Sequence, residues 1–317
     1  MTKPFISICT PTFNRRPFIP MIIKCFENQT YPLDRMEWII IDDGTDKIED
    51  LVKDIKQVKY FHYPEKMFLG KKRNEMHDKC SGDIIIYMDD DDYYPPTRVA
   101  HAVDTLLAHP EAMGAGCSQM FIYFKHIDKM FQFGPYGPNH ATAASFAFRK
   151  ELLLTSRYEE TAALAEESAF LKQYTVPFVQ LDVFQTILVF SHVHNSFDKR
   201  KMLEVANNYV QMSEVKVTDF VKDSFIWKFF MVSIDKILEK YEQGLPKYKP
   251  DVLKQMEELT IKRTIKMYEA KIAELTRENT ELKDKNLYLN NKIKDVISNA
   301  IMQHKQNKDS KDNNNKE

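Results

Sequence analysis

The chain has 317 residues, of which 45 are Lys or Arg and 46 are Asp or Glu, so its formal net charge is −1 at pH 7. A chain without a net basic field gives no reason to expect a nucleic-acid partner or an electrostatic attraction to membranes. Hydrophobic residues make up 43% of the sequence and aromatic residues 12%, which is enough for a buried core and excludes a chain that is disordered throughout.

The cysteines and the first residues of the sequence indicate the cellular compartment in which we expect the protein. Cys9, Cys25, Cys80 and Cys117 are scattered and show no C-x-x-C spacing, which is typical of buried thiols in a reducing compartment. Residues 1–16 contain one short apolar stretch and no small-residue cleavage site, and no run in the sequence reaches about 18 apolar residues. We therefore expect a cytoplasmic protein without a secretion signal or a transmembrane segment.

Short apolar runs alternate with amphipathic stretches through residues 1–199. Runs rich in β-branched and aromatic residues predict strands, and stretches with helical spacing predict helices. The strands are expected at 5–11, 37–44, 58–64 and 84–88, and the helices at 19–29, 69–80 and 98–108. This alternation predicts an α/β domain with a largely parallel sheet between helices.

The later part of this domain is expected to add further strands. The β-rich runs 118–124 and 129–134 predict a hairpin that joins the same sheet. Segment 144–153 predicts a strand that runs into a helix, and segment 176–194 predicts one or two more strands.

Three segments follow the α/β domain. Residues 200–245 have apolar positions at helical spacing and predict a helical extension that packs on the domain, whereas the composition of residues 306–317 predicts a disordered tail. Between them, residues 246–305 carry a linker and a heptad repeat. Its a positions are Ile265, Ile272, Asn279, Asn286, Ile293 and Ala300, and its d positions are Ile261, Tyr268, Leu275, Leu282, Leu289 and Val296.

The heptad repeat predicts a partner. Asn279 and Asn286 at successive a positions favour a parallel two-stranded coiled coil in a fixed register, and hence a homodimer. The alternative is a single amphipathic helix that packs back on its own domain.

Four consecutive aspartates, Asp89 to Asp92, follow the apolar run 84–88. Ligands of open α/β sheets bind beyond the carboxyl ends of the strands, which is where this run delivers the four carboxylates. Adjacent carboxylates repel one another, and a hard divalent cation such as Mn²⁺ or Mg²⁺ relieves that repulsion. The sequence therefore predicts a metal site, and the alternative of a solvated acidic turn is disfavoured because the preceding run is too apolar for a surface loop.

Two other predicted strands end in polar residues at the same edge of the sheet. Pro11-Thr12-Phe13-Asn14-Arg15 follows the first strand, and Asp42-Asp43-Gly44 follows the second. A carboxylate there can accept a hydrogen bond from a base or a ribose, although Asp and Gly also form ordinary turns. The chain lacks both G-x-G-x-x-G after the first strand and G-x-x-x-x-G-K-[ST], so neither dinucleotide nor P-loop phosphate binding is supported.

These segments resemble the motifs of family 2 glycosyltransferases of the GT-A fold, in the order and spacing of that family, from residue 4 to about residue 197. The matching segments are Pro11-Thr12-Phe13-Asn14-Arg15, Ile39-Ile40-Ile41-Asp42-Asp43-Gly44, Gly70-Lys71-Lys72-Arg73-Asn74 and Tyr87-Met88-Asp89-Asp90-Asp91-Asp92-Tyr93-Tyr94, the last containing a D-x-D motif. The resemblance implies a nucleotide-sugar donor, usually a UDP-sugar, a divalent metal ion and an inverting transfer to a glycan, protein or lipid acceptor that the sequence does not identify.

The resemblance also implies roles for individual residues. The residues implied to bind the nucleotide are Pro11, Thr12, Asn14, Arg15, Asp42, Asp43, Lys71, Arg73, Asp89 and Asp90. Among them, Asp43 would recognise uracil and Asp89 would bind the ribose. Asp91, together with Asp92, would hold the metal, and a late histidine of the family, here His194, would join them.

An inverting transfer requires a general base that deprotonates the acceptor hydroxyl. The family usually places Glu-Asp at the start of a helix, and the matching residues here are Glu166 and Glu167. Glu167 takes the usual Asp position, so we expect it to be the base, with Glu166 as the second candidate. The alternative is two acids that stabilise a helix N-terminus.

Two other functions remain open at this stage. A sugar-phosphate nucleotidyltransferase shares the strand–helix pattern but needs a glycine-rich triphosphate loop, which the first turn lacks. A catalytically inactive, nucleotide-sugar-binding adaptor organised by its coiled coil is disfavoured because the acids expected of an active site are present.

Overall fold

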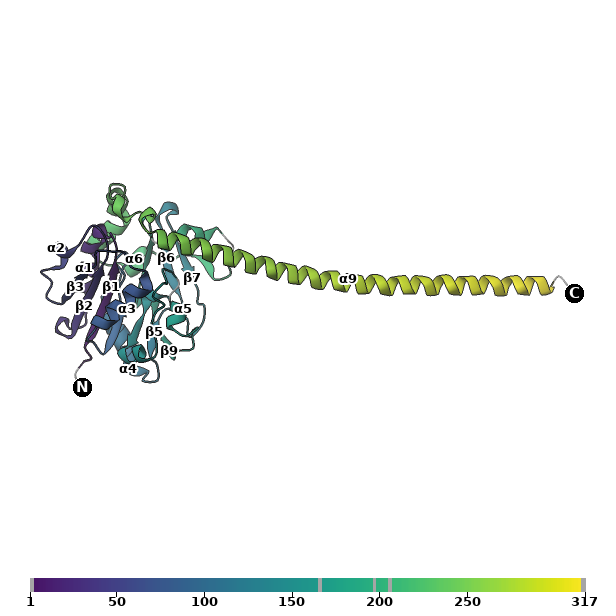
Figure 1. Ribbon diagram of the computed structural model, residues 1–317, viewed down its shortest axis with the longest axis horizontal. Coiled ribbons are helices and arrows are strands. Elements are labelled where there is room, and N and C mark those ends of the chain that lie inside the picture. Colours follow the sequence, from purple (N-terminus) through teal and green to yellow (C-terminus); the bar gives the residue numbers. More distant parts are fainter. Residues whose placement is uncertain (1–2, 165–166, 196–197, 205–206, 315–317) are drawn as a thin grey trace. The chain divides into compact units, whose positions relative to one another are not determined.

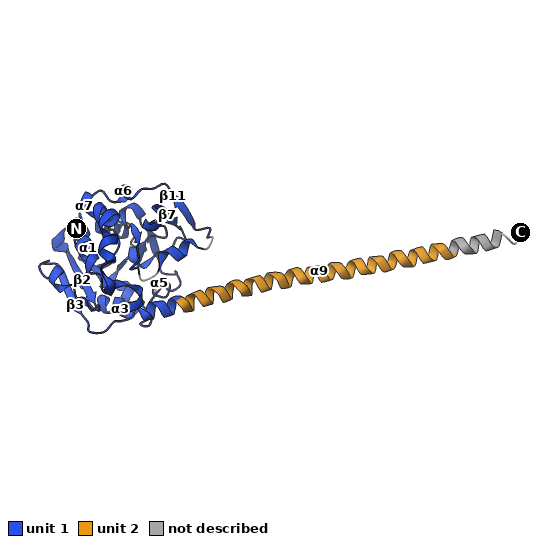
Figure 2. Cartoon of the chain, turned by 90° about the horizontal axis from the view of Figure 1, so that it is seen from above, with its two compact units in different colours: residues 1–256 blue, residues 257–317 orange. Residues whose placement is uncertain are grey.

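The computed structural model describes residues 3–164, 167–195, 198–204 and 207–314, with side chains up to residue 305. It divides into two compact units, residues 1–256 and residues 257–317 (Figures 1 and 2). The first unit is an α/β domain, and the second belongs to one long helix.

The α/β domain is built on a mixed sheet. Its strands are β1 (Ile6–Thr12), β2 (Met36–Asp42), β3 (Val58–His62), β4 (Ile84–Tyr87), β5 (Gly114–Gly116), β8 (Ala147–Arg149) and β9 (Phe178–Gln180). They lie in the order β3-β2-β1-β4-β8-β5-β9, in which β1, β2, β3 and β4 are parallel and β8 is antiparallel to both of its neighbours. The predicted α/β class with a mostly parallel sheet is confirmed.

Side chains of the central strands alternate between two cores because successive residues of a strand point to opposite faces. The helices of this unit are α1 (Ile19–Glu27), α2 (Glu49–Val52), α3 (Leu69–Lys79), α4 (Arg98–Ala108), α5 (Glu167–Phe170), α6 (Val217–Phe220), α7 (Ser224–Lys228) and α8 (Ile234–Leu238). Ile8 and Ile86 pack in the core that contains α1 and α4, whereas Cys9 and Tyr87 pack in the core that contains Met76 of α3. The sheet is therefore covered on both faces.

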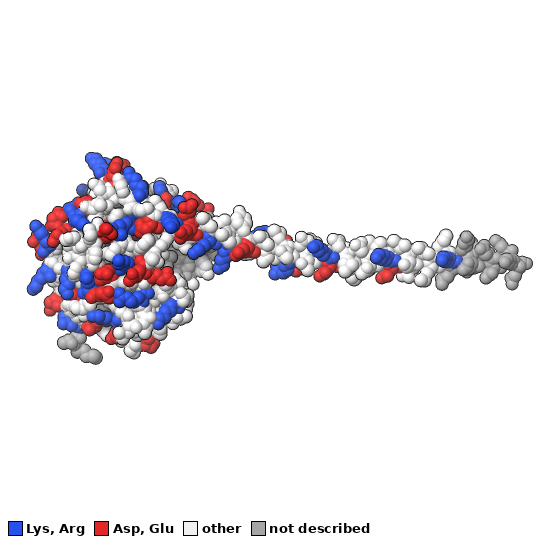
Figure 3. Space-filling model, in the orientation of Figure 1, with Lys and Arg blue, Asp and Glu red and all other residues white. Residues whose placement is uncertain are grey.

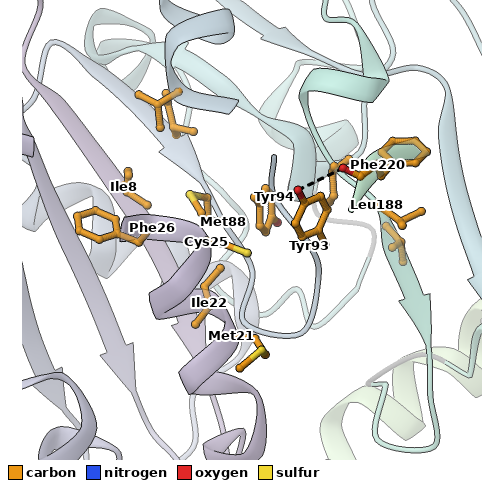
Figure 4. Close-up of a cluster of buried hydrophobic side chains, with 14 of the residues drawn as sticks. Ile8, Met21, Ile22, Cys25, Phe26, Met88, Tyr93, Tyr94, Leu188 and Phe220 are labelled. Atoms are coloured by element: carbon orange, nitrogen blue, oxygen red, sulfur yellow. Dashed lines mark hydrogen bonds between the residues drawn. The ribbon is translucent and has the colours of Figure 1, made fainter. Parts of the chain in front are cut away.

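Figure 4 shows part of the first of these cores, where side chains of α1 point toward the segment that follows β4. Ile22 and Phe26 of α1 are almost fully buried, as are Met88 and Tyr94 on either side of the four aspartates. Apolar packing on both sides fixes the place at which β4 ends and the acidic segment begins.

A second sheet holds the predicted hairpin. Its strands are β6 (Met120–Phe124), β7 (Lys129–Phe133), β10 (Val189–Ser191) and β11 (Val210–Ser213), in the order β10-β6-β7-β11. The hairpin was expected to join the main sheet, and this expectation is wrong: β6 pairs with β10 and β7 pairs with β11, so both edges of the hairpin are occupied within the second sheet.

The segment expected to be a helical extension, residues 200–245, is only partly helical. It contains α6, α7, α8 and a π-helical turn at Phe229–Ser233, but it also supplies strand β11. Its aromatic residues pack on the second sheet, since the Phe230 ring stacks on Phe190 of β10 with 4.2 Å between centroids.

The long helix α9 spans Pro250–Asn314, beyond the residue 305 at which the heptad repeat was expected to give way to a disordered tail. Its first residues belong to the α/β unit, and from residue 260 to residue 305 every side chain is exposed. Among the described residues, no helix combines the length and the apolar character needed to cross a membrane. On the face seen in Figure 3, basic and acidic side chains are interspersed, which agrees with the formal charge near zero.

Candidate active site

A cavity of about 410 Å³ lies beyond the carboxyl ends of β1 and β4, with part of its wall supplied by the second sheet. This is where a ligand of an open α/β sheet is expected to bind. Among the described residues, six basic and six acidic side chains line it. They are Arg15, Lys66, Lys72, Arg73, Lys199 and Lys249, together with Asp89, Asp90, Asp91, Asp92, Glu167 and Asp251.

The four aspartates reach the cavity as predicted, but their environments differ. Burial raises the pKa of Asp90 to about 7 against the opposing charge of Arg15, and burial together with the neighbouring Asp91 raises the pKa of Asp92 well above its usual value. Burial also acts to raise the pKa of Asp91, but Arg15 and His192 outweigh it and hold this pKa well below its usual range. Asp91 is therefore more firmly ionised than Asp90 and Asp92.

Arg15 supplies a buried positive charge to this acidic segment. Its Nη2 lies 3.0 Å from Asp91 Oδ2 and its Nε lies 3.5 Å from Asp90 Oδ1. Its Nη1 donates a hydrogen bond of 2.5 Å to the carbonyl oxygen of His194. The resemblance placed Arg15 near the nucleotide, and the structure places its guanidinium against the acids.

His192, rather than the predicted His194, contacts the acidic segment. His192 Nε2 lies 3.2 Å from Asp91 Oδ2, and its Nδ1 accepts a hydrogen bond from the backbone N–H of His194. Burial lowers the pKa of His192 to about 3, so this ring is neutral at physiological pH. The His194 ring instead packs against Tyr241, with 6.0 Å between centroids. The chain turns after β10, where the backbone N–H of Asn195 donates to the His192 carbonyl oxygen at 3.1 Å.

The acidic segment fits a divalent cation by the chemistry of its donors. Asp90 Oδ2 and Asp92 Oδ1 are buried and have no hydrogen-bond partner among the described residues, and carboxylate oxygens are the ligands that Mg²⁺ and Mn²⁺ prefer. The described part of the chain does not, however, gather three His, Cys, Asp or Glu side chains into a ready-made metal cluster. Because Asp91 already pairs with Arg15, a bound cation would compete with this guanidinium.

Helix α3 directs two cations into the site. Lys72 donates from Nζ to the Thr12 carbonyl oxygen at 3.1 Å and forms an ion pair with Asp43, and Arg73 Nη2 lies 3.7 Å from Asp89 Oδ1. The sequence singled out Lys71 with Arg73, but Lys71 is exposed and does not line the cavity. Residues four apart lie on the same face of a helix, and Met76, four residues after Lys72, is buried. This spacing in the sequence predicts that Lys72, and not Lys71, faces inward.

The other residues implied to bind the nucleotide divide into two groups. Pro11 and Thr12 line the cavity with Arg15. Asn14, Asp42 and Asp43 do not line it, and their side chains hold the surrounding loops.

Their hydrogen bonds make this role clear. Asn14, at φ 52°, accepts hydrogen bonds at Oδ1 from the backbone N–H groups of Thr45 and Asp46. Asp42 accepts from the Gly44 and Ile48 backbone N–H groups.

Glu167 opens the short helix α5 and lines the cavity, whereas Glu166 lies outside the described residues. The helix is anchored by Phe170, whose ring stacks on Tyr158 with 4.4 Å between centroids. A carboxylate therefore enters the cavity from an element other than the one that carries the aspartates.

Sequence reasoning missed the contribution of the segment around the start of α9. Lys249 lines the cavity with only 3% of its surface exposed, and burial, with the nearby charge of Arg15, lowers its pKa to about 6. Asp251 also lines the cavity and forms an ion pair with Lys66. The proline-bracketed sequence 245–250 is typical of a linker and gave no signal of a binding role.

The sheet order, the position of the cavity and the acidic segment after β4 define an α/β domain of the GT-A type. Comparison with known proteins agrees with this fold class, because residues 7–148 are similar to the model of "Glycosyl transferase family 2". This segment is less than half of the chain, and it contains both the first strand and the acidic segment after β4.

Two curated relatives illustrate the similarity. An "Uncharacterized glycosyltransferase" of Haemophilus influenzae is 31% identical over 121 residues, which cover 37% of this chain and 48% of the relative. A "GalNAc(5)-diNAcBac-PP-undecaprenol beta-1,3-glucosyltransferase" of Campylobacter jejuni is 32% identical over 95 residues, which cover 28% and 30% of the two chains. The matches thus span about half or less of the relatives' own length.

Solved structures are more distantly similar. S. aureus TarS in complex with UDP-GlcNAc has a TM-score of 0.47 at 17% identity, covering 59% of each chain. The mannosyltransferase PcManGT from Pyrobaculum calidifontis, in complex with GDP-Man and Mn²⁺, has a TM-score of 0.49 at 15% identity, covering 79% of this chain and 74% of that one.

Proposed function

We propose that the protein is a metal-dependent, inverting glycosyltransferase that moves a sugar from a nucleoside-diphosphate donor, most simply a UDP-sugar, to a hydroxyl acceptor. The observation that carries the proposal is the acidic segment Asp89 to Asp92 at the end of β4, which faces the same cavity as Glu167. The family match over residues 7–148 supports the activity class.

In the proposed reaction, the acceptor oxygen forms a bond to the anomeric carbon of the sugar while the bond from that carbon to the diphosphate breaks. Glu167 takes the proton of the acceptor hydroxyl, so that the attacking oxygen is neutral after transfer. Attack opposite the leaving group inverts the anomeric configuration. A Mn²⁺ or Mg²⁺ ion held by Asp91 and Asp92 would supply Lewis-acid stabilisation of the leaving diphosphate.

Donor hydrolysis tests this proposal without knowledge of the acceptor. A panel of UDP- and GDP-sugars is incubated with the full chain in Mn²⁺, and release of the nucleoside diphosphate is measured with and without EDTA. We expect release from at least one donor, with loss of activity in EDTA and in Asp91→Asn.

The matched control is Asp78→Asn, which changes an acid that pairs with Arg157 on the surface. This variant should keep full activity. Activity that persists in EDTA would exclude the metal, and failure to turn over any donor, or an unaffected Asp91→Asn variant, would contradict the transferase proposal.

We also propose that the chain forms a homodimer through a parallel coiled coil of α9. The a and d residues of the heptad repeat form an apolar stripe that is exposed in the single chain; Ile272, for example, is 62% exposed and Leu282 is 60% exposed. An isolated helix that exposes such a stripe gains stability by burying it against a second copy. Glu278 at g and Lys283 at e would form attractive pairs between the two chains.

A further inference from the structure

The segment 241–256, which we call the C-terminal arm, is fastened to the α/β domain at several points. Tyr241 donates from its hydroxyl to Asp46 at 2.9 Å, and the carbonyl oxygen of Gln243 accepts from Asn14 Nδ2 at 3.0 Å. At the far end, Gln255 exchanges hydrogen bonds with the backbone of Thr161 and Ala163. The arm lies outside residues 7–148, the segment that matches the family model.

These attachments hold Lys249 in the cavity. The Lys249 backbone N–H donates to the Pro246 carbonyl oxygen at 2.8 Å, and its own carbonyl oxygen accepts from Leu253 in the first turn of α9 at 3.1 Å. The side chain is buried and its Nζ lies 3.3 Å from the carbonyl oxygen of His194. Lys247, two residues earlier, has 58% of its side chain exposed, and Lys254 is exposed as well, so the arm turns one of its three lysines inward.

The carbonyl oxygen of His194 is shared by two basic side chains, since Arg15 Nη1 donates to it as well. Arg15 is held by Asp90 and Asp91, so Lys249 adds a second basic side chain beside the most acidic part of the cavity. A lysine that is buried and faces a cavity is suited to an anionic ligand, because the negative charge of the ligand favours the ammonium form. A diphosphate approaching four aspartates needs such a charge to offset their repulsion.

We infer that Lys249 of the C-terminal arm binds the diphosphate of the nucleotide donor. This inference rests on the proposed function for the identity of the donor. A lysine ammonium binds phosphate oxygens as a compact charge, and the burial of Lys249 strengthens the contact. The donor site therefore extends beyond the family segment and is completed by residues that immediately precede and begin α9.

Binding of UDP, uridine and inorganic pyrophosphate to the full-length protein tests this inference by calorimetry. We expect Lys249→Met to weaken the affinity for UDP and for pyrophosphate about ten- to a hundredfold, as for loss of a hydrogen bond to a charged group. The affinity for uridine should not change, and Lys249→Arg should restore most of the loss. Lys247→Met is the control and should bind all three as the wild type does.

A second measurement needs no variant. Limited acetylation followed by mass spectrometry measures the reactivity of Lys249, with Lys247 as the internal reference. Pyrophosphate and UDP should both protect Lys249 and leave Lys247 unaffected. Absence of protection, or Lys249→Met affinities equal to those of Lys247→Met, would overturn the inference. If pyrophosphate protects Lys249 and UDP does not, Lys249 binds another diphosphate, such as that of an acceptor. This result would also overturn the inference.

These results are separable from the test of the proposed function. If UDP and pyrophosphate depend on Lys249 but no sugar donor is turned over, the transferase proposal fails and the diphosphate site stands. If a donor is turned over and Lys249 is neither protected nor needed for UDP affinity, only the present inference fails.

Discussion

Arg15 illustrates how strongly the charge balance of the cavity depends on a single side chain. The residue before it, Asn14, adopts a left-handed backbone conformation directly after β1, and Arg15 then pairs with Asp90 and Asp91. Side-chain pairing of this kind depends on backbone angles in a turn, which sequence patterns do not specify. The sequence could predict that the aspartates lie at the end of a strand, but not that an arginine neutralises part of their charge.

At the same scale, Glu167 is predicted to act as the general base. Glu167→Gln keeps the size of the side chain but cannot accept a proton, so kcat for turnover of the preferred donor should fall about 10²- to 10⁴-fold with little change in the donor KM. Steady-state kinetics measure both constants. The exposed Glu160→Gln serves as the control, and a Glu167→Gln variant with unchanged kcat would remove Glu167 from the mechanism.

His77 gives a prediction for the pH dependence of stability. Burial, with the charges of Arg73 and Arg157, lowers the pKa of His77 from its usual 6.5 to about 3. Between these two values the unfolded chain binds more protons than the folded chain. The free energy of unfolding therefore falls as the pH falls, by at most about 1.4 kcal/mol per pH unit for this group.

Urea unfolding near neutral pH and at about pH 5 measures this contribution. Stability should decrease less steeply with falling pH in His77→Gln than in the wild type, whatever the stability of the variant at neutral pH. His126→Gln, at an exposed position, should leave the dependence unchanged. Parallel curves for wild type and His77→Gln would contradict the assignment.

At the scale of the element, the turn of helix α3 determines which of two neighbouring lysines is buried. The Nζ of Lys72 is buried against Asp43, whereas Lys71 is exposed on the opposite side. Lys72→Met leaves a buried carboxylate without its partner and should lower the free energy of unfolding by about 3 to 5 kcal/mol. Lys71→Met should change it by less than about 0.5 kcal/mol. Chemical denaturation of the two variants measures the difference, and equal stabilities would show that the ion pair contributes nothing.

The elements differed in how well the sequence predicted them. The apolar strands β1, β2 and β4 and the helices α1 and α4 follow the predicted ranges closely, because each buries an apolar pattern. The polar helix α3 also lies within its predicted range. The strand Gly114–Gly116 was missed because three small residues carry no pattern. The second sheet was missed because partner choice for a hairpin depends on the edges that distant segments offer, here Val189–Ser191 and Val210–Ser213.

At the scale of the whole molecule, the predicted dimer depends on the stripe of a and d residues in α9. Leu275→Asp combined with Leu282→Asp places charges in the centre of the proposed seam and should convert the dimer to monomer. Analytical ultracentrifugation of the full chain measures this change, while donor hydrolysis should persist. The same substitution at the outward f positions, Ala270→Asp with Asn291→Asp, should leave the dimer intact. A wild-type chain that sediments as a monomer would contradict the dimer itself.

The even balance of charge around the cavity has a consequence for how quickly a ligand arrives. Among the described residues, the formal charges of the six basic and six acidic side chains that line the cavity cancel, so its long-range potential is weak. An anionic ligand is then attracted only once it is within about one Debye length, near 10 Å in 0.1 M salt. Its association rate should consequently be nearly independent of ionic strength, and selectivity should arise in how slowly the bound ligand departs.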